Sequence, residues 1–267
     1  MNLRPLRVVP TTDPGPRAGS VVVLDNVSKT FGHGTKSVVA LDNVNLSVAS
    51  GEFVCLLGAS GCGKSTLLNL VAGLDRPTTG TVEVRASRTA LMFQEAALFP
   101  WLTVRGNVEL ALKLAGVPRQ RRRIRSMQLL EMVHLADFAN KRPHELSGGM
   151  RQRTALARAL AQDADVMLMD EPFGALDAMT RDVLHDELEG LWRETKKTVI
   201  FVTHNVREAI RLGDRVVLLT SRPGRVAEVF PVDIPRPRRI DSPEVAILAA
   251  SITDRLRAER QRHARGQ

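Results

Sequence analysis

The chain has 267 residues, of which 43% are hydrophobic and 25% charged, and a formal net charge of +9. This composition predicts a globular protein with a sizeable core and excludes a fibrous one. Its longest apolar runs are far shorter than the about 20 residues of a membrane-spanning helix, and its N-terminus lacks a signal-peptide core, so we expect neither a membrane span nor secretion. Cys55 and Cys62 are too few for a disulfide framework and predict a reducing, cytosolic setting.

The positive charge is concentrated in three segments. Residues 118–125 contain five Arg, residues 1–20 have a net charge of +2, and residues 231–267 contain eight Arg and five acids, so the remainder is nearly neutral. Such segments can bind nucleic acid or anionic lipid headgroups, but solvated arginine is the commoner explanation. We therefore expect no nucleic-acid partner and treat charge as weak support for any function.

Taken in chain order, short β-rich runs alternate with helical patterns. The expected strands lie at 21–27, 38–48, 52–58, 81–84, 90–93, 166–170, 198–204 and 215–219. The expected helices lie at 64–72, about 106–135, 149–161, 179–195 and 206–211. This alternation predicts the α/β class.

Two segments interrupt the alternation. Residues 96–150 are almost purely helical, with Gly116 and Pro118 as breaks, which indicates a helical subdomain inserted into the sheet-containing core. After Pro231 a Pro- and Arg-rich linker leads to a helix capped near Ser242. We therefore expect a disordered N-terminal extension (1–19), a main domain (20–231), and a linker with a C-terminal helix (232–267).

The strongest motif is GASGCGKST, which follows an apolar strand and precedes a helical run, the context of a P-loop. Its glycines let backbone N–H groups surround phosphates at a helix N-terminus, while Lys64 reaches the β- and γ-phosphates and Ser65 binds magnesium. The alternative is a glycine-rich turn that merely connects the strand to the helix, and the complete motif together with its flanking strand and helix disfavours it. The predicted phosphate-binding residues are Gly58, Ala59, Ser60, Gly61, Cys62, Gly63, Lys64, Ser65 and Thr66.

Cys62 allows a separate expectation. A helix N-terminus can lower the pKa of a thiol, so we expect Cys62 to react with maleimide and to be protected by ATP.

Two further motifs concern hydrolysis. The apolar run VMLMD ends in Asp170, suited to magnesium, and the following Glu171 can orient or deprotonate an attacking water. A solvated acidic pair at a strand end is the alternative, but its position after a P-loop favours ATP hydrolysis. In LSGGMRQR, Ser147, Gly148 and Gly149 begin a helix and present a second anion site.

With LSGGMRQR as its signature motif and VMLMDEPFGALD as its Walker B and D-loop, the chain resembles ABC transporter ATPases over about residues 20–230. The resemblance implies a RecA-like P-loop NTPase core with an antiparallel β subdomain and an inserted α-helical subdomain. It further implies that Asp177 contacts nucleotide, that Gln94 of the Q-loop acts in catalysis and on Mg²⁺, and that His204 contacts the γ-phosphate. Taken alone, Gln94 is more often a surface residue and His204 an ordinary strand-end histidine.

In the family an aromatic residue stacks on adenine, usually tyrosine. This chain has no tyrosine, and Phe31 takes that place, with ordinary core packing as the alternative. Because each chain carries one P-loop and one signature motif, the resemblance implies a head-to-tail pair of ATPase subunits, with ATP and Mg²⁺ bound between the P-loop of one and the signature motif of the other.

The stretches FQEAALFPWLTVRGNV and SRPGRV resemble the importer branch that serves nitrate, sulfonate, taurine and bicarbonate. This implies two transmembrane permease subunits, an extracytoplasmic solute-binding protein as an indirect partner, and a place at the cytoplasmic face of the cell membrane; we favour aliphatic sulfonates. Leu98, Phe99, Pro100 and Trp101 form either the permease groove or subdomain core. Alternatives are a non-transport ABC ATPase acting on nucleic acid or ribosomes and a P-loop small-molecule kinase.

Overall fold

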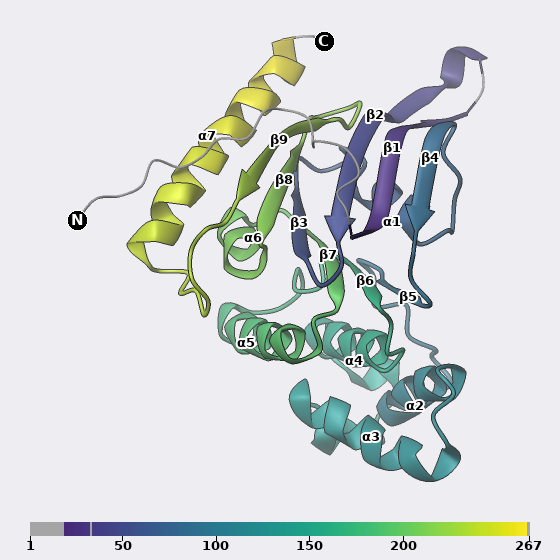
Figure 1. Ribbon diagram of the computed structural model, residues 1–267. Coiled ribbons are helices and arrows are strands. Elements are labelled where there is room, and N and C mark those ends of the chain that lie inside the picture. The colour runs from purple at the N-terminus through teal and green to yellow at the C-terminus, as the bar shows by residue number, and fades with distance from the viewer. Residues whose placement is uncertain (1–18, 33, 266–267) are drawn as a thin grey trace. The chain divides into compact units, whose positions relative to one another are not determined.

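The computed structural model describes residues 19–32 and 34–265, and the chain forms two compact units (Figure 1). The first unit consists of the described residues up to Ala86 and from Thr198 onward, and the second is Ser87–Lys197. Apart from Gly19, the expected N-terminal extension lies outside the described residues. Within the described part of the chain, no helix is both long and apolar enough to cross a membrane.

The first unit contains an antiparallel sheet of three strands in the order β2–β1–β4. Its strands are β1 (Ser20–Phe31), β2 (Val38–Ala49) and β4 (Thr79–Val84). A short 3-10 helix, Gly34–Lys36, precedes β2. The inward-facing residues of β1 and β2 are mostly Val and Leu, so this sheet has one apolar face.

A second group of strands in the first unit follows the order β7–β3–β8–β9. The strands β7 (Thr198–Thr203), β3 (Phe53–Leu57) and β8 (Arg215–Leu219) are parallel, and β9 (Val226–Pro231) is antiparallel to β8. Every residue of the three parallel strands is buried, as expected for strands covered on both faces.

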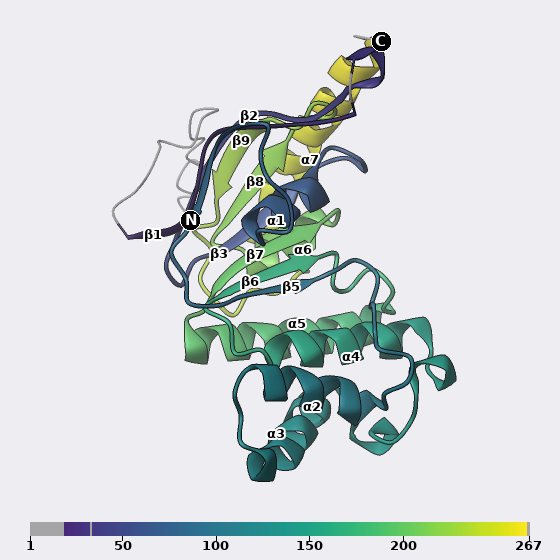
Figure 2. The ribbon, with the colours of Figure 1, turned by 90° about the vertical axis from the view of Figure 1, so that its right-hand side faces the viewer.

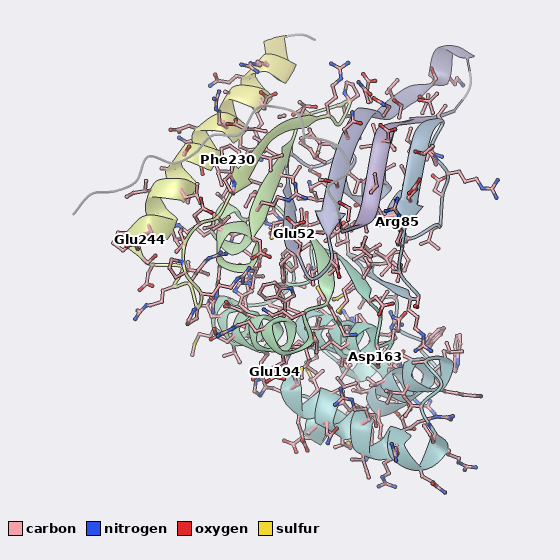
Figure 3. All side chains as sticks on the ribbon, in the orientation of Figure 1. Glu52, Arg85, Asp163, Glu194, Phe230 and Glu244 are labelled. Atoms are coloured by element: carbon pink, nitrogen blue, oxygen red, sulfur yellow. The ribbon has the colours of Figure 1, made fainter. Side chains whose placement is uncertain are left out.

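Three helices cover these strands (Figures 1 and 2). The helix α1 (Lys64–Val71) contacts β2, β4 and β7, and therefore lies between the two groups of strands. The helix α6 (Val206–Leu212) packs on β3, β7 and β8, and α7 (Pro243–Arg265) packs on α6. Ser242 caps α7 because its Oγ accepts a hydrogen bond from Val245 N at 3.3 Å, and Glu244 lies in the first turn (Figure 3).

An ion pair fixes the amino ends of β3 and β8. Arg215 Nε lies 2.6 Å from Oε1 of Glu52, the residue before β3, and both side chains are largely buried (Glu52 is labelled in Figure 3). Val54 and Arg215 are also paired in the sheet. The P-loop follows the opposite, carboxyl end of β3, so this ion pair supports the sheet without touching the loop.

The second unit combines two parallel strands, β5 (Thr89–Met92) and β6 (Val166–Asp170), with four helices. Between the strands lie α2 (Val104–Leu114), α3 (Arg119–Met132), α4 (Gly148–Leu160) and the short 3-10 helices Ala136–Phe138 and Pro143–Glu145; α5 (Ala178–Thr195) follows β6. The helices α2, α3 and α4 pack on one another, and α4 also contacts β5.

The predicted α/β class, with its antiparallel sheet, is confirmed. The helical stretch expected at about 106–135 is broken at Gly116 and Pro118, as predicted, into α2 and α3, because Gly116 adopts a left-handed backbone (φ +86°) and Pro118 precedes α3. One element was missed. The strand β9 was not predicted, although its Val229 and Phe230 are buried against the unit.

Candidate functional site

The P-loop between β3 and α1 has a backbone that requires glycine. Gly61 and Gly63 have φ values of +74° and +98°, in the left-handed region that side chains disfavour. A Cβ atom on Gly63 would also lie 2.7 Å from Leu41 Cδ2. Gly63 is the N-cap of α1 and no side chain caps this helix, so its first N–H groups are suited to receive an anion.

Lys64 places a positive charge inside this loop. Its side chain is buried, with 6% exposed, and its Nζ donates hydrogen bonds to the carbonyl oxygens of Gly58 and Ala59, each at 2.9 Å. These bonds compensate the burial of an ammonium group. The next residue, Ser65, is exposed in the first turn of α1. Ammonium, hydroxyl and backbone N–H groups together fit a phosphate group.

The expected lowering of the Cys62 thiol pKa was wrong. Only 1% of Cys62 is exposed, and burial raises its pKa although the nearby Lys64 opposes the shift. The sulfur points toward Gly58: a Cβ atom built on Gly58 would lie only 2.7 Å from Cys62 Sγ. Desolvation therefore outweighs the helix N-terminus.

Two further predicted residues lie in the same unit. Phe31 ends β1 with 44% of its surface exposed, and Lys29 Nζ lies 4.9 Å from its ring centroid. The ring is therefore not part of the core. His204 is exposed and directly follows β7. Because Leu57 of β3 pairs with Thr203 of β7, the P-loop and His204 leave neighbouring parallel strands at the same carboxyl edge, where α/β sheets bind ligands.

The second unit carries the acidic pair. Asp170 is the last residue of β6 and is buried. Glu171 has a φ of +46°, which is uncommon for a residue other than glycine. Gly174 N donates to Glu171 O at 3.1 Å and holds this turn. Met92 of β5 pairs with Met169 of β6 in parallel register. The segment containing Gln94 follows β5 and the acidic pair ends β6, so both lie at the same carboxyl edge of these two strands.

Two residues of α4 that were not predicted from sequence hold these segments. Gln152 is buried, and its Nε2 donates to Gln94 O at 3.2 Å and to Glu171 O at 3.5 Å. Arg158 donates to Ala96 O and Ala97 O at 2.9 and 2.7 Å. The signal was present for Gln152, since it falls on the helix face otherwise filled by buried alanine and leucine.

The signature residues begin α4. Ser147 is its N-cap and accepts a hydrogen bond from Met150 N at 3.2 Å. A Cβ atom on Gly149 would lie 3.1 Å from Leu176 Cδ2, whereas one on Gly148 would meet only the flexible guanidinium of Arg151, at 4.0 Å. Contacts within the chain therefore leave little room for a larger residue in place of Gly149, but they leave room for one in place of Gly148.

Asp177 has a structural function that the sequence analysis did not assign. It caps α5, and its Oδ1 accepts a hydrogen bond from Thr180 N at 2.9 Å. This bond lowers the pKa of the Asp177 carboxyl. The first unit therefore contains Phe31, the P-loop and His204, and the second contains Gln94, the signature residues, the acidic pair and Asp177.

Comparison with known proteins identifies close relatives. A family model described as ABC transporter matches residues 41–174. The nitrate import ATP-binding protein of Synechocystis is 45% identical over 219 residues, covering 79% of this chain and 82% of that protein. The aliphatic sulfonates import ATP-binding protein of Bacillus licheniformis is 45% identical over 222 residues, covering 80% and 86%.

A solved structure matches the fold. It is the dimeric structure of a post-hydrolysis state of an ATP-binding cassette bound to ADP and Pi, with a TM-score of 0.73 and 38% identity. The match covers 80% of this chain and 100% of that one.

Proposed function

Because this chain belongs to the ABC transporter family, in which it is an ATP-binding subunit, we propose that its ATP hydrolysis drives the uptake of a small oxyanion through a separate permease. The observation that carries this proposal is the P-loop, with Lys64 buried among the loop's own carbonyl groups, next to His204 at one sheet edge. Within this proposal each predicted residue has a distinct role.

Nucleotide binding falls to three groups of residues. The backbone N–H groups of the P-loop and Lys64 bind the phosphates, and the exposed ring of Phe31 stacks on adenine. Ser65, Gln94 and Asp170 would hold Mg²⁺, which would supply positive charge to offset the negative charge of the phosphates. No group of three or more His, Cys, Asp and Glu side chains suited to a metal ion occurs among the described residues. Proteins commonly bind Mg²⁺ through one or two carboxylates together with substrate phosphates, and Asp170 would be the carboxylate here.

Hydrolysis is assigned to Glu171 as the general base. Its left-handed backbone, held by the bonds from Gly174 and Gln152 to its carbonyl, fixes where the side chain leaves the turn. Backbone strain of this kind is frequent at catalytic residues. His204 contacts the γ-phosphate, and Gln94 positions the attacking water and the metal.

We propose that two copies pair head to tail, with Ser147, Gly148 and Gly149 of one copy contacting the γ-phosphate bound by the other. Two observations support this. The open surroundings of Gly148 leave space for a group from outside the chain, and the similar cassette bound to ADP and Pi is dimeric. ATP then favours the closed pair and hydrolysis releases it.

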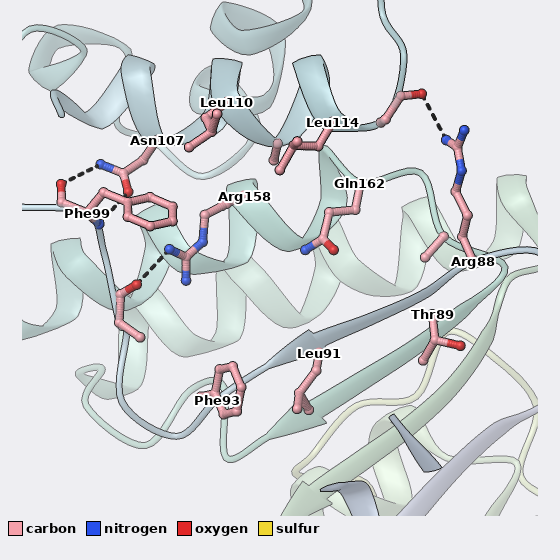
Figure 4. Close-up of a pocket in the computed structure, with 14 residues that line it drawn as sticks. Arg88, Thr89, Leu91, Phe93, Phe99, Asn107, Leu110, Leu114, Arg158 and Gln162 are labelled. Atoms are coloured by element: carbon pink, nitrogen blue, oxygen red, sulfur yellow. Dashed lines mark hydrogen bonds between the residues drawn. The ribbon is translucent and has the colours of Figure 1, made fainter. Parts of the chain in front are cut away.

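A cavity of about 470 Å³ in the second unit is the proposed permease site (Figure 4). Phe99 lines it and is held by Asn107, whose Oδ1 accepts from Phe99 N at 2.9 Å, and by Arg158, whose guanidinium lies 5.8 Å from the ring centroid. Trp101 packs on Phe99 but is 68% exposed, so it is not core packing. We expect Trp101→Ala to lose permease binding in a pull-down while its basal ATPase rate is retained. Retained permease binding would contradict this placement.

For the cargo, we propose an aliphatic sulfonate, with taurine, nitrate and bicarbonate as alternatives. The two relatives named for sulfonates and nitrate are equally similar to this chain, at 45% identity, so the solute must be measured. In this scheme the chain works at the cytoplasmic face of the membrane, bound to two permease subunits, and an extracytoplasmic solute-binding protein selects the solute.

The test is reconstitution with candidate permease and solute-binding proteins of the same organism. We expect sulfonate uptake that requires ATP and is lost with Lys64→Ala. Uptake of nitrate but not of sulfonates would show that nitrate is the transported solute. Tight, salt-sensitive binding to DNA or ribosomes without any permease partner would refute the transport role.

A further inference from the structure

The turn between β8 and β9, residues 220–225, is held in one conformation by its own hydrogen bonds. We call it the 220–225 turn. Thr220 Oγ1 donates to Pro223 O at 2.6 Å and accepts from Arg225 N at 2.9 Å. The backbone N–H of Thr220 also donates to Arg225 O at 2.9 Å. A turn closed by three hydrogen bonds is a rigid element rather than a loose connection.

This rigid turn lies directly against the P-loop. Arg222 Nε donates a hydrogen bond to Gly61 O at 2.9 Å. A Cβ atom on Gly61 would lie 2.9 Å from the same guanidinium, and a Cβ atom on Gly224 would lie 2.2 Å from Cys62 O. The turn therefore contacts the P-loop at two consecutive residues, through the Arg222 side chain at Gly61 and through the Gly224 backbone at Cys62.

The turn is also attached to β2, which supports the P-loop from a second direction. Gly224 N donates to Ala40 O at 2.9 Å, and Asp42 N donates to Gly224 O at 3.0 Å. Arg225 Nε forms an ion pair with Asp42 Oδ2 at 2.9 Å. Two residues of β2, Ala40 and Leu41, also press on Gly63 of the P-loop. The P-loop is thus supported by the 220–225 turn and by β2 together.

Such support matters because the P-loop is rich in glycine. Glycine loses more conformational freedom than any other residue when a loop becomes ordered. Ordering the loop at the moment of binding would reduce affinity, whereas a loop that is already ordered binds more tightly. A guanidinium bound to Gly61 O restricts rotation of the Gly61–Cys62 peptide group, whose N–H donates to Ala59 O at 3.3 Å, and so holds the middle of the loop in one conformation.

We infer that the 220–225 turn pre-organises the P-loop, and that Arg222 is a positioning residue for phosphate binding. The inference rests on the proposed nucleotide role of the P-loop. The P-loop backbone contacts the α- and β-phosphates, so the effect is the same for nucleoside diphosphates and triphosphates. Arg222 acts through Gly61 and does not touch the nucleotide itself.

The experiment measures binding of ADP and of adenylyl imidodiphosphate, with Mg²⁺, to the full chain by calorimetry. The variants are Arg222→Ala, Arg222→Lys and, as a matched control, Arg257→Ala, which removes an exposed arginine of α7 paired with Asp254. A charge-assisted hydrogen bond at an exposed site is modest, so we expect Arg222→Ala to weaken both nucleotides by about fivefold. Arg222→Lys should lie between Arg222→Ala and the wild type, and Arg257→Ala should match the wild type.

The melting temperature without nucleotide distinguishes positioning from general stability. We expect it to fall by less than about 2 °C in Arg222→Ala, since one exposed hydrogen bond is lost. Unchanged affinity for both nucleotides would overturn the inference, and so would a loss restricted to the triphosphate analogue, which would indicate direct contact with the γ-phosphate. If the wild-type chain itself bound neither nucleotide, the proposed function would fail first.

Discussion

The replacement Glu171→Gln tests the proposed catalytic step. Glu and Gln have nearly the same size, so the variant fits the half-buried turn after β6 and its left-handed backbone. The hydrogen bonds from Gly174 and Gln152 reach the main-chain carbonyl and are retained. The replacement removes the carboxylate that is proposed to accept a proton from water.

General-base catalysis contributes about 10²- to 10⁴-fold to a rate, or about 2.7–5.4 kcal/mol of activation free energy. We expect kcat to fall by this factor. The phosphates are bound by the P-loop and Lys64, which the replacement leaves intact, so the Kd for ATP should stay within about twofold, or about 0.4 kcal/mol. With binding retained and turnover blocked, an ATP-bound dimer should accumulate.

Three measurements follow from this expectation: phosphate release at steady state, ATP binding by calorimetry, and particle mass by light scattering with and without ATP. Glu187→Gln, an exposed position on α5, is the matched control and should behave as the wild type. Hydrolysis by Glu171→Gln at the wild-type rate would refute the assignment of Glu171 as the base. Loss of ATP binding would instead indicate that the turn after β6 has a part in holding the nucleotide.

Three further predictions concern other parts of the chain. Phe31→Ala should weaken ATP binding about two- to tenfold, the contribution of an aromatic contact, and unchanged affinity in a fluorescent-nucleotide assay would refute stacking. Glu52→Ala leaves Arg215 buried without its carboxylate, which costs about 3 kcal/mol and lowers Tm by roughly 6–12 °C; a calorimetric shift below about 2 °C would contradict it. Cys62 should react with maleimide only slowly in the native chain, because burial raises its pKa, and rapid labelling at pH 7 by mass spectrometry would show the thiol to be accessible.

The parts of the site that were predictable from sequence are those whose chemistry depends on adjacent residues. The P-loop has its strand, its glycines, Lys64 and Ser65 within one short segment, so local spacing is sufficient to identify it. The position of Glu171 after an apolar strand is similarly local. The contacts of Gln152 and Arg222 join residues that are 58 and 161 positions apart. A local pattern indicates that Gln152 lies on the buried face of its helix, but it does not identify the distant residues that Gln152 and Arg222 contact.

The errors have the same physical origin. The direction of the Cys62 thiol depends on its packing against Gly58, which the motif alone does not reveal. The strand β9 gains its stability from pairing with β8, and a short strand without strict alternation gives a weak signal of its own.

The open position of Gly148 has a consequence for the mutations that this chain tolerates. Alanine favours helix more than glycine does, by up to about 1 kcal/mol, and the described structure offers no obstacle to a methyl group there. A selection for cellular abundance should therefore accept Gly148→Ala, whereas a selection for growth on the transported solute should reject it if a second copy's nucleotide lies against this residue. At Gly149 a methyl group would lie 3.1 Å from Leu176 Cδ2, so alanine there requires the Leu176 side chain to shift. Comparing the two adjacent glycines in both selections therefore separates effects on folding from effects on assembly.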